Sequence, residues 1–372
     1  MHVPSSNGMS VNHRGALSIS PAARFRELRV NRTVYLVGFL LLITPWALWF
    51  EGLWAELNTP TWALNLSHST VAALIRANLQ GFALGTANST TFYVAVAAAI
   101  GIALFGYDRF AGGLFYSLEG PLRRREVFTA KVLYGTITIL LPVAAGTAGA
   151  LLFADLSGNL GLAGAIAMRG LFDATGELSL FATALAMGSS MGTVFSAIAT
   201  VTWAALPSLL QSLLSNLFLV SNRSVVILGG QSVSESTLRF AYPWIAHLAF
   251  ALPNLSPFQP AGFEGWPLSA VLALIAWFVA WTVLVLWLAY GWWERAPFER
   301  LRDAVFFPFL WNLYYAFLSL LSTLVFGALI THGTVFGVAW AAIYLVLFIA
   351  GWFFWRFVVI WRGGRADRPV RA

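Results

Sequence analysis

The chain has 372 residues, of which 59% are hydrophobic and only 10% carry a charge, and its mean hydropathy is +0.75. A soluble protein of this length would carry about a quarter of charged residues, so an ordinary water-soluble fold is excluded. Cysteine is absent, which rules out a disulfide framework, a thiol nucleophile and a thiolate metal site. The net charge of +7 follows the loops between apolar runs, so it indicates membrane topology and not a nucleic-acid partner.

Long stretches without charge divide the chain into membrane-spanning segments. A helix needs about 20 apolar residues to cross roughly 30 Å of hydrocarbon. Two of the stretches without Asp, Glu, Lys or Arg, 178–222 and 304–355, are each long enough for two helices joined by a tight turn. The runs do not alternate with polar residues, so helices are expected and a β-barrel is not. The sequence therefore predicts an all-α polytopic membrane protein with about eight transmembrane helices, at 33–53, 88–107, 129–153, 175–192, 195–218, 267–292, 309–330 and 335–359.

The distribution of basic residues predicts the orientation. If the loops alternate and the N-terminus lies inside, 18 of the 22 Lys and Arg residues fall on the inside. The outside then keeps Arg76, Arg169, Arg223 and Arg239. Because basic residues concentrate on cytoplasmic loops, both termini are predicted to be cytoplasmic. The protein is expected to be a multi-pass protein of the cell (plasma or inner) membrane.

The N-terminal region, 1–32, is expected to be a cytoplasmic tail. Ser20-Pro21 can begin a helix, in which Ala22, Phe25 and Leu28 share one side with arginines around it. Such a segment is either a helix at the membrane surface or an ordinary basic flank that only sets topology. The apolar run that follows is longer than that of a signal peptide and lacks a small-residue cleavage site, so a retained span is predicted.

Residues 33–361 are predicted to form a single transmembrane domain, followed by a basic cytoplasmic tail at 362–372. The longest outer loop, 219–266, holds several prolines and bulky aromatic residues. Within it, 240–252 is apolar and bounded by prolines, and we expect it to dip into the outer leaflet without crossing. A ninth span there would move the arginines after residue 294 to the outside, against the charge rule.

Motifs for catalysis are absent from the sequence. A Walker A loop needs Gly-Lys followed by Ser or Thr, and the only lysine, Lys131, lies between Ala130 and Val132. None of the five histidines has a second histidine or an acidic residue at the spacing of a zinc site. No catalytic residue, metal site or cofactor is therefore expected in this chain. The charge-free stretches also indicate that no ionisable groups converge inside the bundle, which argues against an ion-coupled carrier.

Two charged elements, 108–128 and 294–303, are predicted on the cytoplasmic side. In the first, Pro121 can begin a helix whose opening turns hold three adjacent arginines. Lys131 follows where this helix enters the membrane, and its ammonium group is expected to reach lipid phosphates. The second element has mixed charge and a proline in its first turn. Each element is either a plain positive-inside loop or a docking site for a cytoplasmic partner.

The same residues resemble a known family. Pro121-Leu122-Arg123-Arg124, followed seven residues later by Lys131, resembles the Leu-Pro-x-x-Arg-x-x-x-x-x-x-Lys signature that opens the third span of ABC-2 type transporter permeases. The segment Arg295-Ala296-Pro297-Phe298-Glu299-Arg300 is similar to the Arg-x-x-x-Glu-basic segment after the sixth span of a subgroup described as acetoin-utilisation permeases. Gly120 stands where the family has leucine, and Leu301-Arg302 stand where the subgroup has Ala-Gly.

The resemblance implies the membrane-spanning permease subunit of an ATP-binding cassette transporter, which exports a hydrophobic or amphipathic substrate. The implied partners are a cytoplasmic ATP-binding subunit that holds ATP and magnesium, a second permease copy or paralogue in a dimer, and membrane lipid. The residues expected to couple to the ATPase are Glu119, Pro121, Arg123, Arg124, Arg125, Glu126, Arg295, Glu299 and Arg300. The alternative is a self-sufficient secondary carrier or lipid flippase.

Overall fold

The protein is a helical membrane protein. The computed structural model describes residues 19–58, 68–84, 90–110, 123–190, 196–204, 206–207, 219–228, 231–240, 267–295, 312, 315–316, 318–320, 322–323, 326 and 338–366. These residues are helical apart from one hairpin and short connections. Among these residues, three helices are long and apolar enough to cross a membrane, namely Pro21–Glu56, Arg124–Leu156 and Leu268–Arg295. The coarse prediction of a helical, membrane-embedded protein is therefore confirmed.

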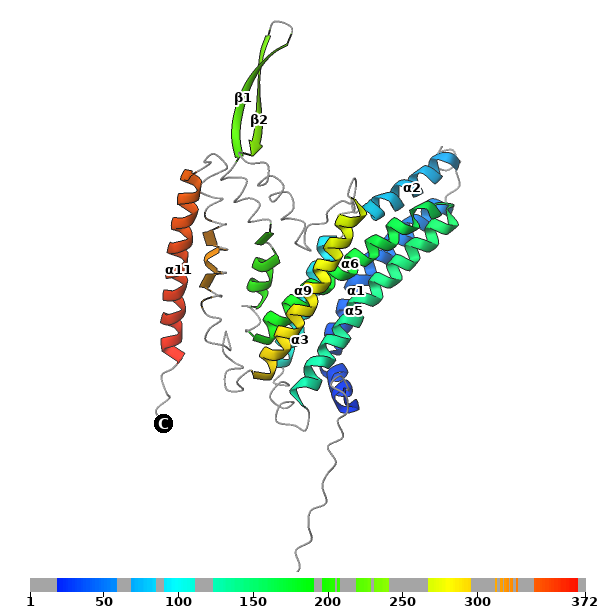
Figure 1. The fold of residues 1–372 in the computed structure, drawn as a ribbon. Coiled ribbons are helices and arrows are strands. Elements are labelled where there is room, and N and C mark those ends of the chain that lie inside the picture. The colour runs from blue at the N-terminus through cyan, green and yellow to red at the C-terminus, as the bar shows by residue number, and fades with distance from the viewer. Residues whose placement is uncertain are drawn as a thin grey trace, which may run out of the picture.

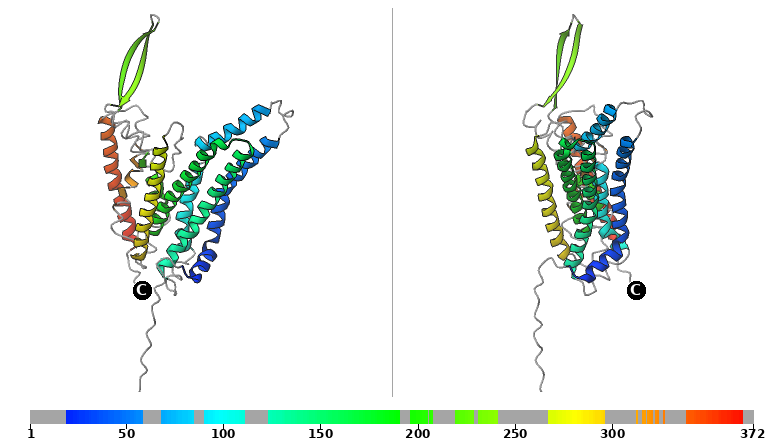
Figure 2. Two further views of the ribbon diagram at one scale, coloured as in Figure 1. Left: turned by 45° about the vertical axis from the view of Figure 1, so that its right-hand side comes forward. Right: turned by 90° about the vertical axis from the view of Figure 1, so that its right-hand side faces the viewer.

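Long helices that run up and down form the bundle (Figure 1). They are α1 (Pro21–Asn58), α3 (Thr90–Phe110), α5 (Arg124–Leu156), α6 (Ala163–Ser190) and α9 (Leu268–Arg295). The shorter α2 (His68–Leu84) lies against α1, α5 and α6, in a segment that the sequence had indicated only as an outer loop. α11 (Val338–Ala366) stands on the other side of the molecule from α1 and α5 (Figure 2).

One end of the bundle collects exposed arginines. α1 and α5 begin at this end, and α3, α9 and α11 finish there (Figure 1). Exposed arginines lie at the start of α1 and α5 and at the end of α9, among them Arg24, Arg29, Arg123 and Arg295. We call it the arginine end, and the opposite end, where α2 lies, the far end. The alternation of helix directions agrees with the loop order expected from the charge pattern.

The outer faces of the helices are apolar. Leu48, Val283, Trp287, Leu345 and Phe353 are each at least 60% exposed. A water-soluble protein rarely exposes apolar side chains over such long helical faces. These faces therefore match contact with lipid chains.

The first helix joins two segments that the sequence had separated. α1 contains both the predicted span at 33–53 and the amphipathic stretch after Ser20-Pro21, in one helix. Phe25 is 68% exposed and Leu28 44% exposed, whereas Ala23 is buried against Ala130 of α5. The helical start at Pro21 is thus confirmed. Its placement at a membrane surface stays a prediction.

The prediction for the fourth span was wrong at its start. α6 begins at Ala163 and not near residue 175, after a tight turn in which Gly158 has a φ of 71° and a short 3-10 helix, η1 (Leu160–Leu162). The first half of α6 carries charged residues that lower its hydropathy, so the sequence pattern assigned it to an outer loop. Most of α6 is nevertheless buried against α3, α5 and α9. Arg169 is therefore inside the bundle, not on an outer loop as predicted.

A β-hairpin interrupts the all-helical pattern. β1 (Leu219–Leu228) and β2 (Gln231–Phe240) pair antiparallel, with Leu228 opposite Gln231. The two residues between the strands in the sequence are glycines, which two-residue hairpin connections favour. The hairpin projects from the far end of the bundle (Figure 1), so the all-α prediction is wrong for this part of the outer loop.

Some predicted segments lie wholly or mostly outside the described residues. The apolar segment 240–252 lies outside them except for Phe240, the last residue of β2. Of 195–218, residues 196–204 and 206–207 are helical, and of 309–330 only the few residues given above are described. The predicted span at 335–359 overlaps α11.

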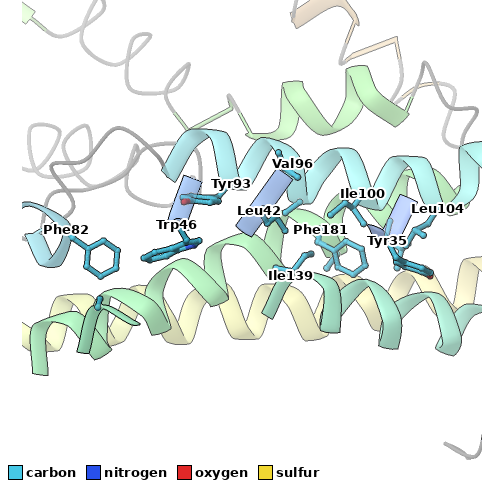
Figure 3. Close-up of a cluster of buried hydrophobic side chains, with 14 of the residues drawn as sticks. Tyr35, Leu42, Trp46, Phe82, Tyr93, Val96, Ile100, Leu104, Ile139 and Phe181 are labelled. Carbon is cyan, nitrogen blue, oxygen red and sulfur yellow. The ribbon is translucent and has the colours of Figure 1, made fainter. Parts of the chain in front are cut away.

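The largest apolar core lies where α1, α3, α5 and α6 meet (Figure 3). Trp46 of α1 lies beside Tyr93 of α3, with ring centroids 6.0 Å apart. Glycines bring the helix backbones close together. Gly135 of α5 lies under the ring of Phe181, and a Cβ atom at Gly101 of α3 would lie 2.7 Å from the carbonyl oxygen of Phe181.

Candidate functional site

A buried charged cluster ties three helices together at the arginine end. Its members are Arg26, Glu27, Asn31 and Tyr35 of α1, Asp108 of α3 and Lys131 of α5. Lys131 Nζ lies 2.7 Å from Asp108 Oδ2 and 3.3 Å from Glu27 Oε1. It also donates a hydrogen bond of 2.8 Å to the carbonyl oxygen of Leu104. The amide of Asn31 donates to Asp108 Oδ1 at 3.2 Å, so each helix is bonded to both others.

The sequence places the α1 members on one helical face. Glu27, Asn31 and Tyr35 follow at intervals of four residues, which stacks their side chains along the same side. The hydroxyl of Tyr35 donates to Glu27 Oε1 at 2.6 Å, and the amide of Asn31 donates to the same atom at 2.7 Å. These bonds hold the Glu27 carboxylate toward Lys131.

The cluster is balanced in charge. Arg26 and Lys131 bring two positive charges, and Glu27 and Asp108 bring two negative charges. The side chains of Glu27, Asp108 and Lys131 are fully buried. Breaking such a pair by removing one partner costs about 3–5 kcal/mol, because a buried charge is left uncompensated. The prediction that Lys131 reaches lipid phosphates is therefore wrong, since its ammonium group is enclosed by acidic partners.

A second contact joins the start of α5 to the end of α9. Arg124 donates to the carbonyl oxygens of Trp293 (3.5 Å) and Glu294 (3.0 Å), and Trp293 Nε1 donates to the Arg124 carbonyl at 3.0 Å. Arg125 forms an ion pair with the Glu294 carboxylate. We call this contact the α5–α9 junction.

The junction explains why arginines stand at a helix N-terminus. Positive side chains are unfavourable there, because the helix dipole already places partial positive charge at that end. The last carbonyls of a helix lack partners within the helix and attract cations. Arg124 supplies a cation for the last turn of α9. The arginine at the start of α5 therefore stabilises the C-terminus of α9 and not the N-terminus of its own helix.

The structure brings the two predicted coupling elements together at this junction. Helix α5 begins at Arg124, with Arg123 at the cap, and not at Pro121. Glu126 accepts a hydrogen bond of 2.6 Å from Ser20, so Arg124, Arg125 and Glu126 all have partners within the chain. Arg123 and Arg295 are exposed. Glu119, Pro121, Glu299 and Arg300 lie outside the described residues.

A row of ionisable side chains runs along α6 toward the middle of the bundle. Arg169, Asp173 and Glu177 are spaced by four residues and are 2%, 7% and 1% exposed. Arg169 Nε donates to Asp173 Oδ2 at 3.0 Å, and Arg169 NH2 lies 3.0 Å from Asp173 Oδ1. Glu177 is the third member. Its Oε2 atom is buried and accepts no hydrogen bond in the described part of the chain.

These three residues overturn one conclusion from the sequence. The charge-free stretches indicated that no ionisable groups converge inside the bundle, because the stretch that covers most of the predicted fourth span begins at residue 178, directly after Glu177. Intramembrane charges are costly and usually mark functional positions. The regular spacing of four residues at 169, 173 and 177 is the signal that could have identified this part of the chain as a helix with one polar face.

Comparison with known proteins identifies no relative of this chain. Neither the family models nor the curated proteins match the sequence, and no solved structure matches the fold.

Proposed function

We propose that this chain is the membrane-spanning permease subunit of an ATP-binding cassette exporter, moved by separate cytoplasmic ATPase subunits. In this proposal the chain crosses the cell membrane about eight times, as a helix length of about 20 residues allows. Both termini and the arginine end face the cytoplasm. A second copy or a paralogue completes the dimer, and the substrate is hydrophobic or amphipathic. The proposal starts from the resemblance of 121–131 and 295–300 to ABC-2 permeases.

The observation that carries the proposal is the α5–α9 junction. It joins the first segment that resembles the permease family, at Arg124, to Trp293 and Glu294 of α9, which directly precede the second segment although they lie far from Arg124 in the sequence. A push on the surface beside Arg123 acts on α5 directly and on α9 through Arg124 and Glu294. The charged cluster, through Lys131, connects the same helix to α1 and α3. A motor bound at one surface therefore acts on four helices together.

The charge of the arginine end supports the proposed orientation. Arg24, Arg29, Arg123 and Arg295 are exposed there. Basic residues concentrate on the cytoplasmic side of membrane proteins. An acidic cleft of an ATPase would pair with such a surface, and each exposed pair would contribute about 0.2–1 kcal/mol. Several pairs are needed for a stable complex, so a test must change more than one arginine.

The test compares the chain purified from its native membrane with the chain expressed alone. We expect ATP hydrolysis in the native preparation and none in the chain alone. The double substitution Arg123→Glu and Arg295→Glu should remove the ATPase activity from the native preparation. A matched control is Arg76→Glu, which reverses an exposed arginine on α2 at the far end and should keep the activity.

Two results would contradict the proposal. ATP hydrolysis by the chain expressed alone would show that the motor is not a separate subunit. Equal loss of activity in the Arg76→Glu control would show that the arginine end has no special role.

The second candidate is a self-sufficient carrier, and Glu177 is the observation that favours it. Ion-coupled carriers bury acidic groups near the middle of the membrane, where the coupling ion needs a partner. Transport by the isolated chain in liposomes, driven by an ion gradient without ATP, would support this candidate over the exporter.

A further inference from the structure

Glu177 is a buried carboxyl group for which the described residues supply no hydrogen bond at Oε2. Its residue is 1% exposed. The neighbouring Asp173 forms an ion pair with Arg169, whose Nε donates a hydrogen bond to Oδ2, and that pair is neutral. A lone ionised carboxylate inside an apolar bundle is far more costly than a neutral carboxylic acid. The environment therefore favours a form in which a positive species neutralises Glu177.

The position of Glu177 follows from two close contacts on either side of it. Gly170 of α6 faces Thr147 of α5, and Phe181 of α6 faces Gly135 of α5. Residues 170, 177 and 181 share one helical face, because they are separated by seven and four positions. Glu177 therefore points toward α5 between these two contacts. It is about 20 Å from each end of α6, at a rise of 1.5 Å per residue.

Few titratable groups lie around Glu177 in the described part of the chain. On α6 they are Asp173 and Arg169, which lie one and two turns nearer the far end. On α3 it is Tyr93, whose hydroxyl is close enough to interact electrostatically with both carboxyl groups. Lys131 of α5 and Tyr290 of α9 lie at the arginine end in the charged cluster and beside the junction, away from this depth. Arg76 of α2 is exposed.

We propose that Glu177 is a proton-binding site in the middle of the membrane, reached from the far end along the α6 face that carries Arg169 and Asp173. In the step, the carboxylate takes up one proton and one O–H bond forms; on release the same bond breaks. No other bond changes and no oxidant or reductant is needed. The site binds a proton and not a larger cation because the glycine contacts on both sides close the helices together and leave Glu177 almost wholly enclosed. This proposal does not depend on an ATPase partner.

The first experiment is infrared difference spectroscopy of the whole protein in lipid. The C=O stretch of a protonated carboxylic acid is resolved from that of a carboxylate. We expect a protonated-carboxyl band at neutral pH that disappears at alkaline pH. Glu177→Gln should remove the band, whereas the matched control Glu51→Gln, at an exposed position of α1, should keep it.

The second experiment needs no variant, so it holds even if Glu177→Gln does not fold. Dicyclohexylcarbodiimide is an apolar reagent that modifies protonated carboxyl groups buried in membranes, and mass spectrometry locates the modified residue. We expect modification at Glu177 that becomes slower as the pH rises.

Three outcomes would overturn the proposal. One is a protein without the band at neutral pH, and the second is a band unchanged by Glu177→Gln. The third is loss of labelling on addition of sodium or potassium at constant pH, which would assign the site to an alkali cation. Labelling at Glu177 that slows with rising pH and is insensitive to both salts would support the proton.

Discussion

Replacing Lys131 with methionine tests whether the charged cluster anchors the bundle. Methionine keeps most of the side-chain volume and removes the positive charge. The ammonium group lies 2.7 Å from Asp108 Oδ2 and 3.3 Å from Glu27 Oε1. At an effective dielectric constant of about 20, the shorter contact alone is worth about 6 kcal/mol of attraction. Desolvation of the charges offsets part of this gain, and the expected net loss of unfolding free energy is about 3–5 kcal/mol.

A double-mutant cycle separates the lost pair from lost packing. Lys131→Met leaves two carboxylates with one arginine, Arg26, as the remaining cation. Adding Asp108→Asn restores the charge balance and keeps an oxygen acceptor for Asn31. The double variant should therefore be more stable than Lys131→Met alone, and the coupling energy between the two positions should lie in the upper part of the range of about 0.5–3 kcal/mol for residues in contact.

The assay is reversible unfolding of the purified protein in mixed micelles, followed by tryptophan fluorescence. The control is Leu133→Met on the same helix, whose side chain is 39% exposed and should change stability little. A cost below about 1 kcal/mol for Lys131→Met would match a solvent-exposed charge and refute the buried anchor. An absent coupling energy with Asp108 would refute the pairing itself.

Two further substitutions test the packing and the junction. Gly101→Ala would place a Cβ atom 2.7 Å from the backbone oxygen of Phe181, so we expect the unfolding free energy to fall by about 1–3 kcal/mol in the same assay. The control is Gly52→Ala, whose Cβ atom would meet nothing within 4 Å. Equal effects at the two glycines would contradict the contact at Gly101. Arg125→Ala removes an exposed ion pair with Glu294 and should change stability little in the same assay, because water screens such a pair; a loss as large as that of Gly101→Ala would contradict this expectation.

The sequence was informative where one physical property dominated a segment. The apolar runs predicted α1, α3, α5, α9 and α11 because hydrocarbon excludes unpaired backbone groups and favours helices over any open structure. The asymmetric distribution of basic residues also agreed with the helix directions, because topology depends on a sum over many residues. Such sums tolerate local exceptions.

The sequence did not predict the environment of residues whose burial depends on a partner from a distant part of the chain. Lys131 has the position of a residue that reaches the membrane surface, and only the fold brings Asp108 and Glu27 around it. Hydropathy likewise assigned Arg169 to a loop, because a window average cannot tell a polar face turned into a bundle from a polar segment in water. Burial of charge depends on contacts between distant parts of the chain, which a single sequence does not display.

The two buried charge sites differ in a way that bears on motion. The charged cluster is neutral, bonded across three helices and costly to break, so α1, α3 and α5 move as one body at that end. α6 packs against this body through Gly101 and Gly135 on Phe181 and through Gly170 on Thr147, contacts that hold helices close but impose little directional bonding. Sliding of α6 past α3 and α5 therefore breaks fewer directional contacts than separating α1, α3 and α5 from one another. Such a shear displaces Glu177 from its enclosed position while leaving Lys131 paired. The rate of proton exchange at Glu177 should therefore change far more with Gly135→Ala than with Gly52→Ala.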